Sequence, residues 1–587
     1  MCDLQAQVTA LLLQGAYQQV VALLQAQIDV EPDDIYHYWQ LGLAYLLMGE
    51  ELEAQGIWLA ALATLDEQTQ ESSVLDLVEY LEAIATQFSV LASDRLEPID
   101  RQILELDPNR ESACLRLMEV LANQQRWEEA IACGAHLLTL RPDDIGIYNN
   151  LGILWEYQGT IEKAIACYQR ILELDPHHAS ACYHLGRCHQ QQNESLAEKY
   201  YQTSLSLDPA QVAAYYDLGA LYEHQGQLEQ AIACYQGLLS KHPEESKAYH
   251  YLGYCLQKVG CFEEARTAFD RSIELNPDDP DAYFNRSSLL LLLGKFEQGW
   301  QDFEFRRLME GYPVPHFPFP LWDGASLNGK RILLVAEYGF GDTLQFIRYA
   351  LLVAQQGGRV IVQAPDALIP LLQSIEGIDE VVSHSSQPPF CEIYVPLMSL
   401  PYLFRTELET IPHSSPYLFA PTDRAVSLQK TKSSNKINVG IAWAGNPQYR
   451  SDRTRSCHLR TLLPILQVPG VEFYSLQKGE SAAQLLELPD PDSIQDLGSQ
   501  FKDFGDTAAV IAQLDLVITT DTAIAHLAGA LGKPTWVLLS FVPDWRWLLD
   551  REDSPWYPTM RLFRQTQPGD WEGVMGRVAE ALYARLI

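Results

Sequence analysis

Three short polar clusters in the second half of the chain have residue types that could do chemistry. The first is Gly339-Phe340-Gly341-Asp342-Thr343, a glycine turn that runs into a carboxylate. A phosphate cradle normally avoids a carboxylate, because the N-terminus of the following helix attracts the anion. Asp342 therefore argues against a simple dinucleotide site. It predicts either a general base that faces a cleft or a residue that only caps the helix expected from residue 344.

The second cluster is basic, in a chain whose formal net charge is −36. Arg450, Arg453 and Arg455 lie close together after a predicted strand that ends at Ala442. Arginines in this position could neutralise a diphosphate, because the guanidinium group matches the geometry of phosphate oxygens. The alternative interpretation is a solvated loop.

The third cluster is Thr519-Thr520-Asp521-Thr522-Ala523-Ile524-Ala525-His526, between an apolar strand and a predicted helix that starts at Ala523. Thr522 and the first free N–H groups of that helix suit an anion. His526 lies one turn later on the same face. Asp521 is either part of this anion site or a plain helix cap.

Alternating strands and helices must position these clusters. Lys330 to Ala336 reads as a buried parallel strand, the pattern from Leu344 to Gln356 is helical, and Val360 to Val362 is a second strand, so that the three form a βαβ unit. Further strands are predicted at 393–395, 439–442, 473–476, 516–519 and 535–539. These elements predict two doubly wound lobes, 330–428 and 436–587, separated by the polar run 429–435. Ligands of such folds lie beyond the carboxyl ends of the strands, where the three clusters fall.

The first half of the chain is dominated by an internal repeat. Prolines recur every 34 residues, with one step of 33, at Pro108, Pro142, Pro176, Pro209, Pro243 and Pro277. Between prolines, small residues such as Gly219 and Ala231 fall where two antiparallel helices touch, and large ones such as Tyr215 and Tyr235 fall where the next pair is wedged in. This pattern resembles the tetratricopeptide repeat and predicts an α-solenoid over residues 1–310. Residues 66–100 break the pattern and are expected to be irregular inserted helices.

Such stacks are quasi-linear, and their concave face usually binds peptides or proteins. A spacer or a dimerisation arm is the alternative. A modified last unit carries Tyr283, Gly294, Gly299 and Phe303. A proline- and aromatic-rich segment, 311–329, follows it. Its run from Tyr312 to Pro320 cannot be helical, and we expect an ordered strap there.

The motifs of the second half resemble the heptosyltransferase-like glycosyltransferases of family 9. The resemblance rests on Gly341-Asp342-Thr343 together with Asp521-Thr522-Ala523-Ile524-Ala525-His526, and it covers nearly all of 315–587. The stretches 443–447, 475–479 and Asp544-Trp545-Arg546-Trp547 look like the bacterial subgroup fused to tetratricopeptide repeats. The family consists of two-lobed GT-B enzymes, with two Rossmann-like lobes, that are inverting and need no metal.

The resemblance implies roles for individual residues. Asp342 matches the catalytic base, Arg455 falls near the basic residue that holds the phosphates, and the nucleotide-diphosphate loop is matched by Asp521, Thr522, Ala523 and His526. We also expect Arg453 to contact the diphosphate and Lys478 or Glu480 to meet the ribose or base. Gly341 and Thr343 would face the acceptor or sugar. Trp545 and Trp547 could stack on a sugar, although core packing is expected of one of them.

The chain also departs from that family. Members acting on lipopolysaccharide commonly have glycine where this chain has Ala523, and they lack the solenoid and the aromatic loop with Trp545, Trp547, Trp556 and Tyr557. Heptose and lipopolysaccharide are therefore not implied. The order of solenoid and GT-B region also resembles protein O-GlcNAc transferases, which is an analogy of architecture alone.

Composition limits the partners. The pI is about 4.7, and the first hundred residues hold a single basic residue, Arg95. Such a surface repels nucleic acid and anionic lipid. It is either simply solvated or complementary to a basic partner.

No apolar run is long enough to cross a bilayer, and the start lacks the pattern of a signal peptide. The eleven cysteines form no CxxC pair, and His184 and His189 beside Cys182 and Cys188 fit no common metal-ligand spacing. We therefore expect a cytoplasmic protein without metal or cofactor.

The sequence thus predicts an enzyme that moves a sugar from a nucleoside diphosphate sugar to a protein or glycan acceptor recruited by the solenoid. The alternative is a non-catalytic scaffold or a sugar-nucleotide sensor.

Overall fold

A computed structural model describes residues 2–91, 95–314, 317–413, 415–424, 428, 436–448, 452–490 and 493–586. Arg450, the polar run 429–435 and part of the strap, Pro315 and His316, lie outside the described residues. The chain forms two compact units, Met1–Gln225 and Gly226–Ile587. Among the described residues, no helix has both the length and the apolar character that a bilayer crossing requires.

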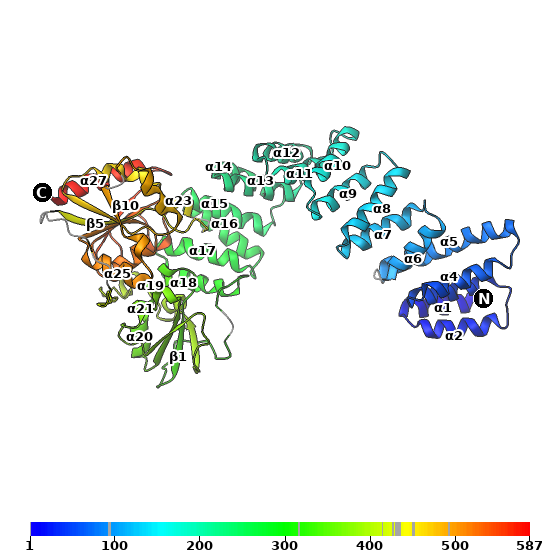
Figure 1. The fold of residues 1–587 in the computed structure, drawn as a ribbon, viewed down its shortest axis with the longest axis horizontal. Helices are drawn as coiled ribbons and strands as arrows, with labels where there is room; N and C mark the ends of the chain where they lie inside the picture. The colour runs from blue at the N-terminus through cyan, green and yellow to red at the C-terminus, as the bar shows by residue number, and fades with distance from the viewer. Residues whose placement is uncertain are drawn as a thin grey trace. The chain divides into compact units, whose positions relative to one another are not determined.

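The first unit consists of helices that pack as consecutive antiparallel pairs (Figure 1). They are α1 (Cys2–Gln14), α2 (Tyr17–Ile28), α3 (Ile35–Leu47), α4 (Glu51–Leu62), α5 (Glu67–Leu91), α6 (Leu96–Leu106), α7 (Glu111–Asn123), α8 (Trp127–Leu140), α9 (Ile145–Tyr157), α10 (Ile161–Leu174), α11 (Ala179–His189), α12 (Glu194–Leu207) and α13 (Val212–Gln225). The long α5 and the short α6 occupy the stretch where the sequence pattern breaks.

The repeat spacing has the packing reason that the sequence suggests. A Cβ atom added to Gly152 would lie 2.5 Å from the ring of Tyr168, and one added to Gly186 would lie 2.6 Å from the ring of Tyr201. Both tyrosine rings are fully buried. The small residue of one helix therefore makes room for the large residue of its partner, in successive repeats.

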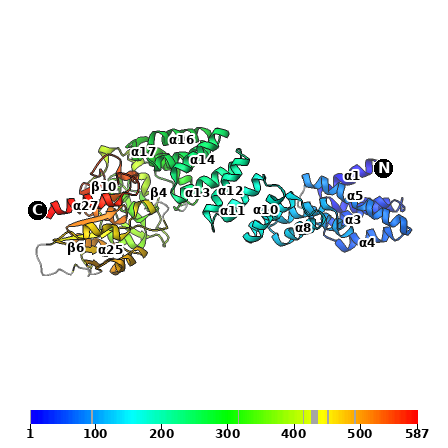
Figure 2. The ribbon, with the colours of Figure 1, turned by 90° about the horizontal axis from the view of Figure 1, so that it is seen from above.

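The second unit begins with the remaining repeat helices. These are α14 (Leu228–Lys241), α15 (Ser246–Lys258), α16 (Phe262–Leu275), α17 (Pro280–Leu292) and α18 (Phe296–Phe303), followed by the 3-10 helix η2 (Glu304–Leu308). Figure 2 shows α16 and α17 beside the α/β part of the same unit.

The first lobe is a parallel sheet of order β3-β2-β1-β4. Its strands are β1 (Arg331–Val335), β2 (Arg359–Ala364), β3 (Glu380–Ser383) and β4 (Ile393–Pro396). Its helices include α19 (Phe340–Phe346), α20 (Ala350–Gln355), α21 (Ile369–Leu372) and α22 (Leu400–Leu403). Part of the strap is ordered, because Leu321 bridges to Tyr394 of β4 and Phe317 packs under the sheet.

The second lobe is a six-stranded parallel sheet of order β10-β9-β8-β5-β6-β7. Its strands are β5 (Ile437–Ala442), β6 (Val471–Ser475), β7 (Ile494–Asp496), β8 (Leu516–Thr520), β9 (Thr535–Leu539) and β10 (Met560–Arg564). Its helices include α23 (Asp452–Arg455), α24 (Leu463–Leu466), α25 (Phe504–Gln513), α26 (Ala523–Ala530) and α27 (Trp571–Leu586). The predicted solenoid followed by two parallel α/β lobes is confirmed; the sequence missed β3, β7 and β10.

The last repeat shares its hydrophobic core with both lobes. Trp300 of α18 is buried, its indole N–H donates to the carbonyl oxygen of Thr406 at 3.0 Å, and its ring meets Trp545 edge-on at 5.2 Å. The side chain of Arg306 is also fully buried, and it makes two hydrogen bonds, of 3.0 and 3.1 Å, to the carboxylate of Glu337 just beyond β1. The compact division after Gln225 falls inside the repeats. The predicted boundary at 310, where the repeat pattern ends in the sequence, stays a prediction.

Candidate active site

Asp342 lies in the first turn of α19, directly beyond the carboxyl end of β1. Its Oδ2 accepts a hydrogen bond from the backbone N–H of the N-cap residue Gly339 at 2.9 Å. The helix begins at Phe340 and not at residue 344 as expected, so Asp342 supports the helix start from inside the first turn. Its Oδ1 accepts one from the guanidinium of Arg546 at 2.5 Å. About a fifth of the side chain stays exposed. Each carboxylate oxygen accepts one hydrogen bond here and has a second lone pair, so capping the helix does not prevent Asp342 from accepting a proton. Its role as the base stays a prediction.

The charge state of Asp342 reflects two opposing effects. Burial raises the pKa of this carboxyl above its usual value of 3.8, and the charge of Arg546 opposes that rise. The negative charges of Asp544 and Glu337 add to the rise.

The second lobe brings the N-terminus of α26 against this turn. Thr522 is the N-cap residue, with extended backbone, and Ala523 begins the helix just beyond β8. A Cβ atom on Gly341 would lie 2.8 Å from the ring of His526 and 3.7 Å from the Cα atom of Ala523. Glycine at 341 therefore allows α19 and α26 to touch, and the structure unites the first and third polar clusters.

His526 is buried inside this contact. Its Nδ1 lies 2.9 Å from the hydroxyl of Tyr557, and its ring stacks on Trp547 at 5.6 Å. Burial, together with the positive charges of Arg546 and other arginines, holds the pKa of His526 well below 6.5. The imidazole is therefore neutral at pH 7 and does not itself supply a positive charge for a phosphate.

Asp521 is a buried carboxyl at the same edge. Burial, reinforced by the charge of Asp544, raises its pKa to about 6, and Arg455 opposes this. Arg455 is thus electrostatically linked to the third cluster, while its Nε donates to Asp452 at 3.1 Å. Arg455 is the last residue of α23, in the segment after β5, and its contact with a diphosphate stays a prediction.

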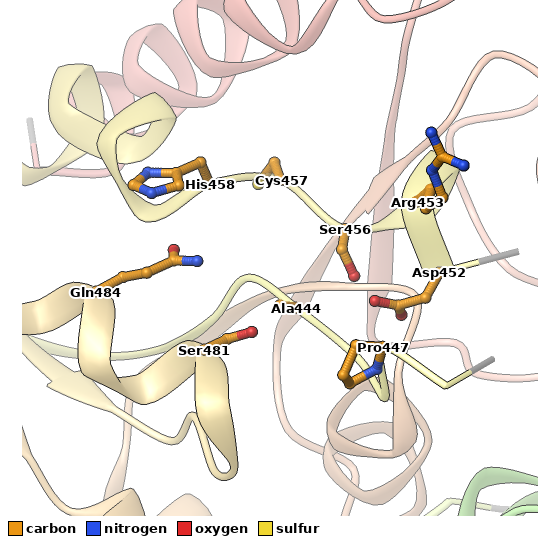
Figure 3. Close-up of a pocket in the computed structure, with 9 residues that line it drawn as sticks. All are labelled: Ala444, Pro447, Asp452, Arg453, Ser456, Cys457, His458, Ser481 and Gln484. Carbon is orange, nitrogen blue, oxygen red and sulfur yellow. The ribbon is translucent and has the colours of Figure 1, made fainter. Parts of the chain in front are cut away.

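Arg453, from the same basic cluster, lines a pocket of about 250 Å³ at the carboxyl ends of β5 and β6. The pocket lies between the loop after β5 and the 3-10 helix η8 (Glu480–Glu487). Figure 3 shows Asp452 and Ser481 pointing into it, with the guanidinium of Arg453 turned away. Its lining residues are Ala444, Pro447, Asp452, Arg453, Ser456, Cys457, His458, Ser481 and Gln484.

Lys478 and Glu480 are both exposed; Lys478 precedes η8, and Glu480 is its first residue. The ammonium of Lys478 donates to the carbonyl oxygen of Phe501 at 2.6 Å. Their neighbour Gln477 is buried, and its amide oxygen accepts from the backbone N–H groups of Trp443 and Ala444, both at 3.0 Å. Gln477, which the sequence did not single out, therefore fixes the loop after β5; contacts of Lys478 and Glu480 with a nucleotide stay a prediction.

The expected aromatic contacts are buried. Trp545 is 5% exposed and Trp547 is fully buried, since Trp300 and His526 cover them. Core packing was expected of one of these tryptophans, and both are packed in the core. Neither indole ring presents an exposed face to a sugar in this structure. Thr343 is likewise 1% exposed, inside α19.

Among the described residues, one group has ligand atoms close enough together to hold a metal ion. It consists of Glu31, Asp34 and His37, in the first unit and far from this site in the sequence. Metal independence of the site stays a prediction.

Family models match both halves of the chain. Tetratricopeptide-repeat models match residues 146–178, 195–253, 246–279 and 268–301. The model of glycosyltransferase family 9 (heptosyltransferase) matches residues 502–539, which contain α25, β8, α26 and the cluster from Asp521 to His526.

Individual proteins match parts of the chain. Protein FlbA of Caulobacter vibrioides is 29% identical over 321 residues, which are 49% of this chain and 52% of that protein. The chain thus spans about half the length of this curated relative. Crystal structures of MamA (24% identity, 29% of this chain, 92% of that chain, TM-score 0.26) and of a tetratricopeptide-repeat protein from Parabacteroides merdae (21% identity, 40% of this chain, 94% of that chain, TM-score 0.32) are also similar. The chain is an α-solenoid that matches tetratricopeptide-repeat models within residues 146–301, followed by an α/β region of two GT-B-like lobes in which residues 502–539 are similar to glycosyltransferase family 9.

Proposed function

We propose that the chain transfers a glycosyl group from a nucleoside diphosphate sugar to a hydroxyl group of an acceptor, with inversion and without a metal ion. One observation carries the proposal: the first turn of α19, which carries Asp342, packs against the first residues of α26 from the other lobe, with Gly341 facing His526 and Ala523. The similarity to glycosyltransferase family 9 falls on the same helix.

The reaction assigns a task to each side of this contact. Asp342 takes the proton of the acceptor hydroxyl while that oxygen forms a bond to the anomeric carbon. On the opposite face of that carbon, the bond to the diphosphate oxygen breaks, and the diphosphate leaves with the electron pair. Negative charge grows on the diphosphate, and the N–H groups at the start of α26 and Arg455 stabilise it.

The repeats recruit the acceptor, a protein or a glycan. Binding it on the same chain raises its concentration near Asp342 without contributing chemistry. The matched repeats at 146–301 support this assignment.

A panel of nucleotide sugars, each incubated with the purified full chain, tests the proposal. We expect slow release of the nucleoside diphosphate from one donor or a few, and faster release once a suitable acceptor is added. Binding of a donor without turnover would favour the sensor, and neither binding nor turnover would favour the scaffold.

A further inference from the structure

Arg546 bonds to groups from both lobes at the candidate site. Its side chain is 9% exposed and lies in the 3-10 helix η11 (Trp545–Trp547) of the second lobe. It donates to Oδ1 of Asp342 at 2.5 Å, to Oδ1 of Asp544 at 2.8 Å and to Oε1 of Gln345 at 2.6 Å. Asp342 and Gln345 belong to α19 of the first lobe, so this one guanidinium joins the lobes beside the proposed base.

The guanidinium is held in one orientation. Its carbon lies 4.3 Å from the ring centre of Trp545 and 5.8 Å from that of Phe346, and both rings are buried. The Trp545 ring is in turn packed edge-on against Trp300 of the last repeat. The three hydrogen bonds leave this planar group little freedom, so the carboxylate it contacts is also fixed in direction.

Other charged and titratable groups surround the pair. Asp544 and Glu337 act on Asp342, while Asp521 and His526 feel the charge of Arg546. In the described part of the chain, Arg546 is the cation that forms an ion pair with Asp342. Without it, burial and two neighbouring carboxylates would all favour the protonated carboxyl, which cannot accept a proton.

We propose that Arg546 is a positioning residue for the reaction: it keeps the Asp342 carboxylate ionised and aimed, and it makes the base functional only when the two lobes are in contact. This inference rests on the proposed function. The sequence places Arg546 in the motif Asp544-Trp545-Arg546-Trp547, but only the structure pairs it with Asp342.

The pH dependence follows from the sign of the interaction. Arg546 lowers the pKa of Asp342, so its removal raises that pKa. The base is then protonated over a wider range, and the acid limb of the rate profile moves to higher pH. Activity lost at pH 7 should be partly regained at pH 9.

The experiment compares Arg546→Gln, Arg546→Lys, Asp342→Asn and the double variant Asp342→Asn/Arg546→Gln in the full chain. Donor turnover is followed from pH 5 to 9, and binding of UDP, ADP and GDP is measured by calorimetry. Arg561→Gln is the matched control, because Arg561 is an exposed arginine of the same lobe that pairs with Glu552. It should leave turnover unchanged.

We expect Arg546→Gln to lower turnover at pH 7 by about 10- to 100-fold, less than the roughly 10²–10⁴ for a lost general base, because the carboxylate itself remains. The acid limb should shift upward, diphosphate affinity should stay the same, and Arg546→Lys should retain part of the rate. The double variant should be no slower than Asp342→Asn, because both changes disable one unit.

Two results overturn this inference without contradicting the proposed function. One is a pH profile of Arg546→Gln that is not shifted. The other is a double variant that is slower than Asp342→Asn by the same factor that Arg546→Gln loses on its own. If Arg546→Gln does not fold, Arg546→Met, which also removes the charge, and the double variant Asp342→Asn/Arg546→Met are judged by the same two criteria. If the wild-type chain turns over no donor at all, the proposed function and this inference both fail.

Discussion

The repeats of the first unit and the last repeat of the second share a sequence pattern but differ in what they pack against. In the first unit, Gly152 and Gly186 each meet a buried tyrosine of the adjacent helix, so the contacts are local and repeated. In the second, Trp300 is buried against Phe346, Trp545 and Trp556 of the two lobes. The same repeat architecture thus packs on itself in the first unit and becomes part of the α/β core in the second.

Charge shows the same difference. Arg101 and Arg126 of the first unit pair with Glu97 and Glu129 at the surface, and such exposed pairs contribute little to stability. Arg306 is instead fully buried against Glu337, whose carboxylate also accepts from the backbone N–H of Met398 and the hydroxyl of Tyr312. The comparison teaches that the last repeat packs as part of the α/β fold, whereas the repeats of the first unit pack on one another.

The largest expected effect on stability comes from truncating the chain on either side of the last repeat. A fragment 226–587 keeps the last repeats and should unfold cooperatively, as one body. A fragment 310–587 lacks Trp300 and Arg306, so it exposes the apolar faces around Trp545 and leaves Glu337 buried without its partner. It should be aggregated or partly unfolded. Circular dichroism melts and size-exclusion chromatography compare the two, and equal melting temperatures would refute the difference.

The buried ion pair gives the next largest effect. Arg306→Met leaves Glu337 buried and unpaired, which typically costs about 3–5 kcal/mol of unfolding free energy. The double change Arg306→Met/Glu337→Leu should cost clearly less than the two single changes together. Urea unfolding measures this, with Arg307→Met, a partly exposed neighbour that pairs with Glu304, as control. Additive costs would mean that the pair is not a unit.

Removing one of the proposed diphosphate contacts should cost less free energy than breaking the buried ion pair. Arg455→Ala and Thr522→Val should each weaken calorimetric binding of a nucleoside diphosphate by about 1.5–3 kcal/mol, the usual cost of losing a charge-assisted hydrogen bond. Arg460→Ala removes a largely exposed arginine that pairs with Glu487 and should leave affinity unchanged. Normal affinity in both test variants would put the phosphates elsewhere.

The smallest effect belongs to the first unit. Gly186→Ala forces a methyl group to within 2.6 Å of Tyr201 and should destabilise the repeats by about 1–3 kcal/mol, the range for overpacking. Gly56→Ala in α4 meets nothing within 4 Å and should be neutral or slightly stabilising, because alanine favours a helix. Donor turnover should be normal in both variants. Reduced turnover in Gly186→Ala would show that the first unit contributes to the chemistry.

The fold was predictable because it follows from periodic patterns in the sequence. The arrangement of the candidate site was less predictable, because it depends on contacts between residues far apart in the chain. The 34-residue spacing predicted the solenoid, and apolar runs such as Ile332 to Val335 predicted central strands. Edge strands β3, β7 and β10 are short or partly exposed and carry weaker patterns. The motifs with Asp342 and with Thr522 to His526 follow the carboxyl ends of β1 and β8, and their role as a site stays a prediction.

Contacts across hundreds of residues left no local signal. The pair of Arg546 and Asp342 spans 204 positions, and that of Trp300 and Thr406 spans 106. The indoles of Trp545 and Trp547 looked available in the sequence, but the last repeat and His526 bury them. Only tertiary packing decides whether such a ring is a binding surface or part of a core.

The central claim is that Asp342 is the base of a sugar transfer at the contact between α19 and α26. The most direct measurement is donor turnover by Asp342→Asn and by Asp366→Asn, an exposed carboxylate of the same lobe, with diphosphate affinity measured in parallel. The account predicts that Asp342→Asn loses about 10²–10⁴ in rate with little change in affinity, and that Asp366→Asn behaves as wild type. Turnover by Asp342→Asn within a few-fold of wild type would reduce Asp342 to a helix cap and contradict the account.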